Sequence, residues 1–311
     1  MGAQLRVYRR QIKSVQSTQK ITKAMELIAA SRIVKAQNRV NAARPYADEL
    51  TRALAALGKD SSLKHPLLTG AQNPRRVGIL VITSDRGLAG GYSANAIKRA
   101  NELADSVRGE GKEPVLYVIG RKGVGYYRFR QIELTDSWTG FSEQPHFIDA
   151  REATETVVAA LEAGSEGAVE GVAGIDELHV VYTRFESMVT QTPTAALIAP
   201  VNLSQAALAE EETSTSGEPG PAYDFEPEPE QLLGELLPRY ISARIFSALL
   251  ESAASESAAR RRAMKSASDN ASDLIKTYTR LANQARQAEI TQEISEIVGG
   301  ADALAAAGSD A

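Results

Sequence analysis

The sequence predicts an α/β protein in which a long antiparallel coiled coil of the N- and C-terminal helices carries a small Rossmann-like α/β domain. Two observations lead to this fold class. Residues 3–44 and 239–298 contain neither Gly nor Pro, so each has the composition of one long helix. Between them, apolar runs alternate with amphipathic segments, which is the pattern of strands and helices around a parallel sheet.

The first long segment, within a predicted helix 1–58, carries a heptad pattern. Its seam residues recur at alternating spacings of three and four, as in a helix that packs along one side against another helix. They are Leu5, Tyr8, Ile12, Val15, Gln19, Thr22, Glu26, Ala29, Ile33, Ala36, Val40 and Ala43. Where this seam turns polar, Ile21, Met25 and Ile28 form a second apolar stripe on a rotated face. The stripe is either local drift of the seam or an exposed surface that meets another protein.

The last long segment, within a predicted helix 232–308, repeats the pattern. Its predicted seam consists of Ala267, Ala271, Leu274, Tyr278, Leu281, Ala285 and Ala288. The heptads alone do not distinguish parallel from antiparallel pairing. Because the two segments are the two ends of one chain with a folded middle between them, antiparallel pairing is the simpler geometry, and we expect it.

The middle of the chain, residues 75–203, predicts the α/β domain. The continuous apolar runs are those of buried parallel strands, and the segments between them have helical periodicity. We expect strands at 76–85, 114–120, 177–185 and 193–201, and helices at 93–107, within 121–130 and at 149–164, the last with Asp149 as its N-cap. Residues 164–174 are Gly-rich and predict a surface loop. Residues 204–231 are acidic and rich in Pro, Ser and Thr, and predict a mobile linker.

The composition excludes several classes of protein. The chain has no cysteine, which excludes disulfides, thiolate metal sites and thiol redox chemistry. It contains no run of about 18 apolar residues that would span a bilayer, and its first residues do not have the apolar core of a signal peptide. We therefore expect a soluble protein on the cytoplasmic side.

The charge of the chain is small in total and uneven along its length. The net charge is -4, yet residues 1–44 carry ten Lys and Arg against the single acid Glu26. Between Arg184 and Arg239 there is no basic residue. Such asymmetry indicates where partners bind and says little about the fold.

The segment SDRGLAGGYSAN, residues 84–95, lies where a strand leads into a helix, which is a usual place for a phosphate-binding loop. Gly87, Gly90 and Gly91 do not have the G-x-G-x-x-G spacing, and no G-K-[ST] follows. The favoured interpretation is a tight turn that needs positive φ. An enzyme that binds nucleotide through residues 87–91 is the alternative.

No group of residues has the pattern of an active site. His65, His146 and His179 are scattered and have no companion at metal-ligand spacing, and we expect His65 and His179 to be structural. No Ser/His/Asp arrangement is evident, so we predict no catalytic, cofactor or metal site. The basic N-terminal helix leaves a second alternative, a coiled-coil scaffold that binds nucleic acid through phosphates, although its apolar heptads argue against that.

Three segments together resemble the gamma subunit of F-type ATP synthase. They are ITKAMELIAASRIVKAQ (residues 21–37), SDRGLAGGYSAN, and the C-terminal ARRRAMKSASDNASDLI with RQAEITQEISEIVGGADAL. The three occur in the family's order, and the match runs nearly end to end. The loop between Gly164 and Gly174 resembles that of actinobacterial members.

The resemblance implies a central rotor shaft. In this family the paired helices project through a ring of three alpha and three beta subunits, while the α/β domain stays beside the epsilon subunit and the membrane c ring. The shaft couples proton-driven rotation of the c ring to ATP synthesis at the beta subunits, and it holds no nucleotide or other cofactor. The implied location is peripheral, on the cytoplasmic side of the cell membrane, with no nucleic-acid partner.

The resemblance also implies which residues contact the ring of alpha and beta subunits. These are Lys23, Met25, Arg260, Gln287, Thr291 and Ile294. Met25 matches a position that faces an acidic lever of the beta subunit, and the charge of Lys23 beside it suits an acidic counterpart. Three others, Arg260, Gln287 and Thr291, match positions that bond to loops of alpha and beta. Ile294 belongs to an apolar stripe, Ile290, Ile294, Ile297 and Val298, that sits in an apolar collar in the family.

Overall fold

The computed structural model describes residues 2–57, 65–169, 172–201 and 228–309, and divides into two compact units. The first unit contains Met1–Ile28 and Arg261–Ala311, and the second contains Ala29–Arg260. Helices α1 (Gly2–Leu57) and α7 (Pro229–Ser309) contribute to both units. Most of the predicted acidic linker 204–231 lies outside the described residues.

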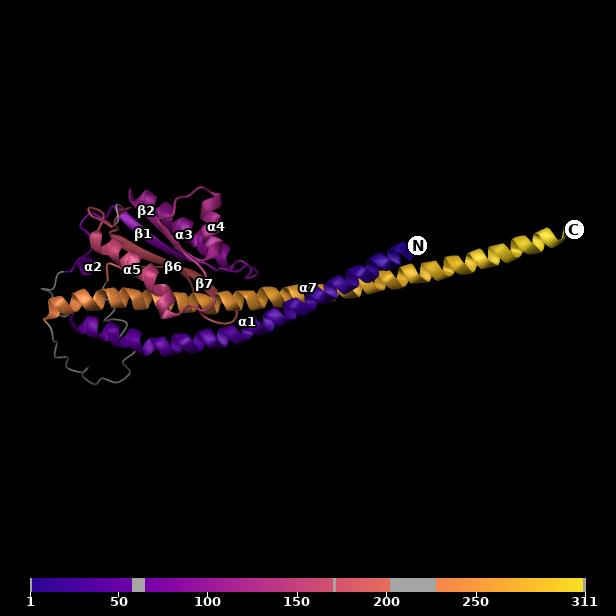
Figure 1. Cartoon of the computed structure of the whole chain (residues 1–311), viewed down its shortest axis with the longest axis horizontal. Coiled ribbons are helices and arrows are strands. Elements are labelled where there is room, and N and C mark those ends of the chain that lie inside the picture. Colours follow the sequence, from indigo (N-terminus) through magenta and orange to yellow (C-terminus); the bar gives the residue numbers. More distant parts are fainter. Residues whose placement is uncertain (1, 58–64, 170–171, 202–227, 310–311) are drawn as a thin grey trace. The chain divides into compact units, whose positions relative to one another are not determined.

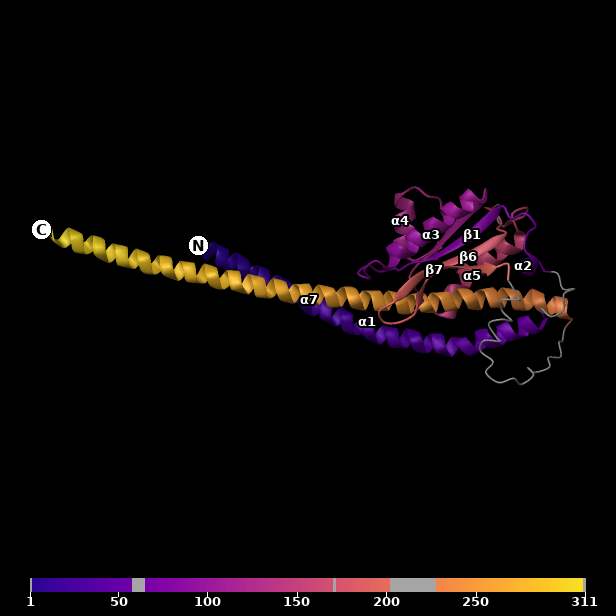
Figure 2. The same ribbon diagram turned by 180° about the vertical axis from the view of Figure 1, so that it is seen from behind.

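In the first unit the two long helices run antiparallel. Tyr8 of α1 stacks on Tyr278 of α7 with ring centroids 6.5 Å apart, and Thr22 lies beside Ser268, so residue numbers rise on α1 as they fall on α7. Figures 1 and 2 both show the indigo start of α1 alongside α7. The antiparallel coiled coil is therefore confirmed. The predicted seam of α1 is the packed side, since its members here are buried or half-buried: Leu5, Tyr8, Ile12, Val15, Gln19, Thr22 and Glu26.

The seam of α7 differs in part from the prediction. Leu274 is 46% exposed and Ala288 is also exposed, whereas Ala271 and Tyr278 do lie in the seam. The buried or half-buried residues at heptad spacing are Met264, Ser268, Ala271, Ile275, Tyr278, Ala282 and Ala285. Relative to the predicted seam, every second position of the observed seam is thus displaced by one residue toward the C-terminus. The sequence offers apolar residues at both 274 and 275 and at both 281 and 282, so its pattern fits two registers.

Both long helices extend beyond the segments free of helix breakers. Helix α1 continues through Pro45, and α7 begins at Pro229 and continues through Pro238. A proline inside a helix removes a hydrogen bond and costs about 3 kcal/mol, whereas one at the first position is favourable. The cost is offset by packing, because the ends of both helices place large side chains in the core of the second unit: Leu54, Leu57, Leu233, Leu237, Ile241 and Ile245.

The second unit is built around a five-stranded sheet in the order β3-β2-β1-β6-β7. Its strands are β1 (Arg76–Ile82), β2 (Glu113–Ile119), β3 (Asp136–Trp138), β6 (Glu177–Phe185) and β7 (Gln191–Ala199). All neighbours are parallel except β6 and β7. The chain order reverses between β1 and β6, as in a doubly wound fold, so the Rossmann-like prediction is confirmed.

Helices cover both faces of this sheet (Figure 1). Helices α3 (Tyr92–Gly109) and α4 (Arg121–Phe129) pack on one face, where Ile79 and Val118 lie. Helices α5 (Phe147–Ala163) and α7 pack on the other, where Leu80 and Tyr117 lie. Successive residues of a strand point to opposite faces, so strands buried on both sides need the continuous apolar runs seen in the sequence.

Several smaller elements differ from the sequence-based expectation. The short strand β3 was not predicted. Asp149 is not the N-cap of α5: His146 is the N-cap, and the Asp149 carboxylate accepts its backbone N–H at 2.9 Å. Within the predicted loop 164–174, β4 (Ala168–Val169) and β5 (Val172–Ala173) form a small antiparallel pair. His65 precedes the one-turn helix α2 (Pro66–Thr69), and its Nδ1 accepts the N–H of Leu67 at 3.2 Å.

Candidate functional site

The glycine-rich loop after β1 forms a tight turn, as the favoured interpretation predicted. Positive φ occurs at Leu88 (62°) and Gly90 (57°), so only one of the three glycines supplies it. The Asp85 carboxylate accepts backbone N–H groups of Arg121, Gly140 and Ser142 at 3.1, 2.8 and 3.0 Å. The Arg121 amide belongs to the N-terminus of α4, a position where phosphates bind in other proteins. The chain's own carboxylate occupies these donors.

The same loop turns two carbonyl groups toward Arg260 of α7. Nη2 of Arg260 donates to the backbone oxygens of Arg86 at 3.4 Å and Gly87 at 3.3 Å. The same atom lies 2.7 Å from Glu256, one turn earlier on α7, and Nη1 lies 3.1 Å from Glu143. The Arg260 side chain is only 6% exposed. Nη2 is thus hydrogen-bonded within the second unit, whereas Nη1 is buried and has the ion pair with Glu143 but no hydrogen bond. Contact of Arg260 with another subunit stays a prediction.

Glu143 and Glu256 complete an arginine–carboxylate cluster, which we define as Arg32, Arg86, Glu143, Glu256 and Arg260. Glu143 also pairs with Arg32 of α1 and, at 3.6 Å, with Arg86. Burial raises the pKa of Glu256 to about 7, because the charged carboxylate loses its hydration; Arg260 opposes this shift, and Glu143 adds to it. Three arginines surround two carboxylates and come from three separate segments of the chain, so the cluster is suited to holding those segments together.

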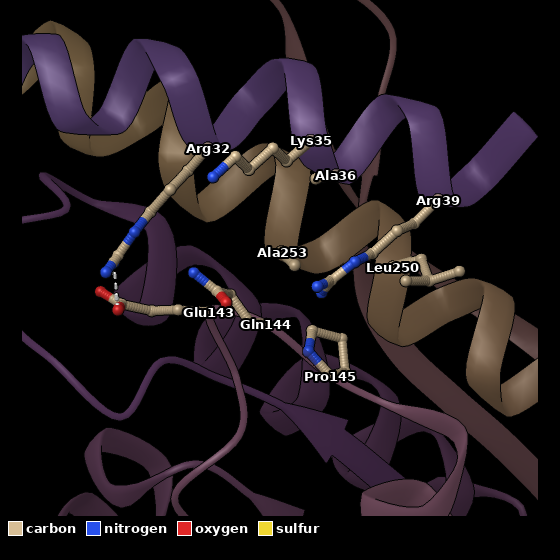
Figure 3. Close-up of a pocket in the computed structure, with 9 residues that line it drawn as sticks. All are labelled: Arg32, Lys35, Ala36, Arg39, Glu143, Gln144, Pro145, Leu250 and Ala253. Atoms are coloured by element: carbon tan, nitrogen blue, oxygen red, sulfur yellow. Dashed lines mark hydrogen bonds and ion pairs between the residues drawn. The ribbon is translucent and has the colours of Figure 1, made fainter.

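A small pocket of about 10 Å³ adjoins this cluster (Figure 3). One side of the pocket is lined by Arg32, Lys35 and Arg39 of α1, and the other by Glu143, Gln144 and Pro145. Leu250 and Ala253 of α7 form its floor. Figure 3 shows the Arg32 side chain extended to the Glu143 carboxylate, whereas Arg39 points toward Pro145 and Leu250.

Lys23 and Met25 lie on α1 in the first unit. The Lys23 ammonium is exposed and pairs with Glu26 at 3.0 Å, while Met25 is half-buried. Beside them, Ile21 is 58% exposed and Ile28 is 53% exposed. Ile21 and Ile28 therefore do not serve the seam, whose side chains are covered by α7, and their contact with another protein stays a prediction.

Gln287, Thr291 and Ile294 lie on α7 in the same unit, spaced by four and three residues, and all are exposed. The Thr291 hydroxyl donates to the Gln287 carbonyl at 2.9 Å, so it is partnered within its own helix. The whole predicted stripe is exposed, namely Ile290, Ile294, Ile297 and Val298. These residues lie beyond the stretch that pairs with α1, because Tyr8, near the start of α1, already stands opposite Tyr278.

The structure therefore does not bring the six predicted residues together. Lys23 and Met25 stand near the level of Ser268, and Gln287 is nineteen residues further along α7, or roughly 28 Å at the helical rise. Arg260 belongs to the other unit. Glu143 and Glu256 were not predicted from the sequence. A signal for Glu256 exists, since it stands four residues before Arg260 among small residues, whereas nothing in the sequence marks Glu143.

The remaining polar candidates have structural partners. His179 on β6 lies 3.7 Å from Glu177, and burial lowers its pKa. Among the described residues, no group of three His, Asp or Glu side chains is arranged to hold a metal ion. Within the same residues, no helix has the length and apolar character needed to cross a membrane.

Comparison with known proteins gives consistent matches over the full length. A family described as ATP synthase matches residues 4–304. The chain is 56% identical over 313 residues to the ATP synthase gamma chain of Saccharopolyspora erythraea, with 99% of this chain and all of that protein covered. It is also 56% identical over 315 residues to the gamma chain of Salinispora arenicola, with both fully covered.

A solved structure has the same fold. A chain of the Euglena gracilis mitochondrial ATP synthase, in an assembly of OSCP, F1 and c-ring, superposes with a TM-score of 0.67. The match covers 98% of this chain and 95% of that one at 17% sequence identity.

Proposed function

Because this chain belongs to the ATP synthase gamma chain family, we propose that it is the central rotor shaft that couples rotation of a membrane c ring to conformational change at catalytic beta subunits. In this role it carries no active site. Its partners are the alpha and beta subunits, the epsilon subunit and the c ring, and it is held at the cytoplasmic face of the cell membrane through that complex. Neither nucleic acid nor a cofactor has a part in this role.

The observation that carries the proposal is the exposed apolar surface on the helices of the first unit. Ile294 and Ile297 of α7 are 56% and 72% exposed, in a helix that the described chain leaves unpaired there. Apolar surface of this kind marks a protein contact. An apolar collar around this end would cover the stripe and still allow rotation, because apolar contact is non-directional.

The basic charge of α1 supports a contact with acidic partners. Residues 1–44 have a net charge of +9, from ten basic residues against Glu26. Lys23 stands on this helix beside the exposed Ile21 and Ile28, and Met25 adds a flexible side chain suited to a sliding contact. We infer that Lys23 and Met25 face an acidic segment of beta, and that Gln287 and Thr291 contact loops of alpha and beta.

Rotation requires that the shaft bias three identical sites differently. A contact shifts an equilibrium only through its differential affinity for the two states, and a swing from 1:99 to 99:1 needs about 5.5 kcal/mol. A pair of helices with apolar residues on one side and basic residues on others presents a different face to each beta subunit. Each site would then pass through binding, synthesis and release in turn.

Reconstitution tests the proposal. An ATP synthase prepared without its gamma chain should regain ATP-driven proton pumping in vesicles when this chain is added. Adding the chain with residues 287–311 removed should restore less pumping, because the exposed stripe is lost. If the full chain binds ATP by itself, or restores no pumping in an assembled complex, the proposal is wrong.

A further inference from the structure

The Glu143 carboxylate contacts both long helices at once. Its Oε1 lies 3.1 Å from Nη1 of Arg260 on α7, and its Oε2 pairs with Arg32 on α1. Figure 3 shows the second of these pairs. Oε2 also lies 3.6 Å from Arg86 in the loop after β1. One side chain of the α/β domain therefore holds one cation from each helix.

The loop that carries Glu143 is itself fixed to the sheet. Glu143 lies between β3 and α5, and its neighbours Gly140 and Ser142 donate backbone N–H groups to the Asp85 carboxylate. The Ser142 hydroxyl in turn accepts the N–H of Asp85 at 2.8 Å. Asp85 stands three residues after the last residue of β1. Any displacement of Glu143 must therefore break hydrogen bonds at the end of a central strand.

The apolar contacts in this region resist sliding poorly. Apart from Glu256, the buried residues of α7 between 252 and 258 are small: Ser252, Ala253, Ala254, Ser255, Ser257 and Ala258. Small side chains interdigitate little, and apolar burial has no preferred direction. Charge-assisted hydrogen bonds do have a direction, and buried ionic groups are known to set the register of paired helices. The directional contacts of the arginine–carboxylate cluster fall in this stretch of small residues, where Ser252 also accepts the N–H of Thr183 on β6 and Ser255 donates to the Thr183 carbonyl.

We propose that Glu143 is a positioning residue that locks the α/β domain to both long helices, so that rotation of one is transmitted to the other. The inference rests on the proposed rotor function and adds a place, besides the packing of both helices in the core of the domain, where torque passes from domain to helices. With the carboxylate present, the domain cannot turn around α1 and α7 without breaking both ion pairs. Without it, the enzyme hydrolyses ATP while part of the rotation is lost as slip.

The test uses the reconstituted ATP synthase with Glu143→Gln. A glutamine keeps the shape, but its single carbonyl oxygen can serve only one of the two helices. We expect ATP hydrolysis to continue, while the ratio of proton pumping to hydrolysis falls by roughly 2- to 30-fold, the range expected for residues that carry coupling between sites. Glu143→Asp should retain more of the ratio, because it keeps the charge.

Two further variants separate this role from a general effect of charge. Arg32→Gln should lower the ratio in the same way, and its combination with Glu143→Gln should be less than additive, because both remove one contact. Glu155→Gln is the matched control, since Glu155 pairs with Arg151 at 2.6 Å on the exposed side of α5 and contacts neither long helix. It should leave the ratio unchanged.

The outcomes separate the inference about Glu143 from the proposed rotor function. A wild-type ratio in Glu143→Gln overturns the inference. An equal fall in hydrolysis and pumping, or failure of both Glu143→Gln and Arg32→Gln to assemble, also overturns it, because the cluster would then serve folding alone. If the wild-type chain itself supports no pumping, the proposed function fails instead.

Discussion

The hydroxyl oxygens of Thr22 and Ser268 lie 2.6 Å apart, although 246 positions separate them in the sequence. Thr22 also donates its proton to the Gln19 carbonyl at 3.0 Å, so the Ser268 hydroxyl must be the donor between the two. Both residues are buried in the seam of the coiled coil. The polar interruption of the heptads on α1 thus provides a directional bond that sets the register of the helix pair.

The direction of this hydrogen bond predicts unequal effects for its two partners. Thr22→Val leaves the buried Ser268 hydroxyl without its acceptor and should lower the free energy of unfolding of the coiled coil by about 1–2 kcal/mol. Ser268→Ala leaves Thr22 bonded to Gln19 and should cost about 0.5–1 kcal/mol. Urea unfolding followed by far-ultraviolet circular dichroism measures both.

The control for this pair is Thr18→Val. Thr18 lies one turn earlier on α1, is exposed and bonds only to the Ser14 carbonyl of its own helix. Its replacement should change the free energy of unfolding by less than about 0.5 kcal/mol. Equal costs for Thr22→Val and Thr18→Val would show that the bond between the helices contributes nothing.

Gly120, at the end of β2, should tolerate no side chain. Its φ is 101°, and a Cβ atom would lie 2.2 Å from the Thr83 carbonyl oxygen. Gly120→Ala therefore forces both backbone strain and a clash with a central strand, and should cost about 3 kcal/mol or more. Thermal unfolding of the purified chain is the measurement.

Gly125 provides the comparison for this substitution. It lies within α4, and no atom lies within 4 Å of the Cβ that Ala would add. Because alanine is the better helix former, Gly125→Ala should stabilise the chain by up to about 1 kcal/mol. A stability of Gly120→Ala equal to that of wild type would contradict the geometry at the end of β2.

The raised pKa of Glu256 predicts a pH dependence of stability. The folded-state pKa is about 7, against an ordinary value of 4.5, so the folded state binds more protons between these two values. The free energy of unfolding should therefore fall as pH rises through this window, with a slope of at most about 1.4 kcal/mol per pH unit. Glu256→Gln removes the titration and should flatten this part of the profile.

Asp176 offers a control of opposite sign. Burial alone would raise its pKa, but hydrogen bonds from the backbone of Arg75, Ser165 and Arg76 lower it below 3.8. Stability from this group is present at higher pH and is lost as pH falls through the lowered pKa. Asp176→Asn should therefore alter only the acidic limb of the profile.

The contradicting outcome for Glu256 is a slope of the free energy of unfolding near neutral pH that Glu256→Gln leaves unchanged. Glu256 would then titrate normally.

The sequence predicted the fold well where one pattern had one solution. The apolar runs of β1 and β2 favour strands buried on both faces, and the structure has these two strands and β6 within a few residues of their predicted bounds. The seam of α7 was harder, because Leu274 and Ile275 are equally apolar. The choice between them depends on which residues of α1 stand opposite, and that partner is far away in sequence.

The arginine–carboxylate cluster likewise could not be predicted from the sequence, because it depends on residues that are distant in the chain. The position of Arg260 in a motif singled it out, and Glu256 stands one turn before it, but its other partners, Glu143 and the loop carbonyls of Arg86 and Gly87, lie more than a hundred residues away. Glu143 looks like any surface glutamate in the sequence, and only the folding of its loop against α1 and α7 gives it a role. Long-range ion pairs have no local signature, unlike caps and heptads.

The exposed end of α7 yields a prediction that separates stability from assembly. Ile294 is more than half exposed in the isolated chain, so Ile294→Glu should change the free energy of unfolding by less than about 0.5 kcal/mol. If an apolar collar covers this residue in the complex, the new carboxylate must be buried there. Binding of the chain to the ring of alpha and beta subunits should then weaken by at least about tenfold.

Ser295→Glu is the matched control, because it adds the same charge one residue further along, outside the apolar stripe. It should weaken binding less than Ile294→Glu does. The fraction of purified ATP synthase complexes that contain each variant, measured over a range of chain concentrations, gives the two affinities. Equal affinities for the two variants would mean that no apolar collar surrounds this side of α7, and the exposed stripe would lose its role as the bearing surface of a rotor.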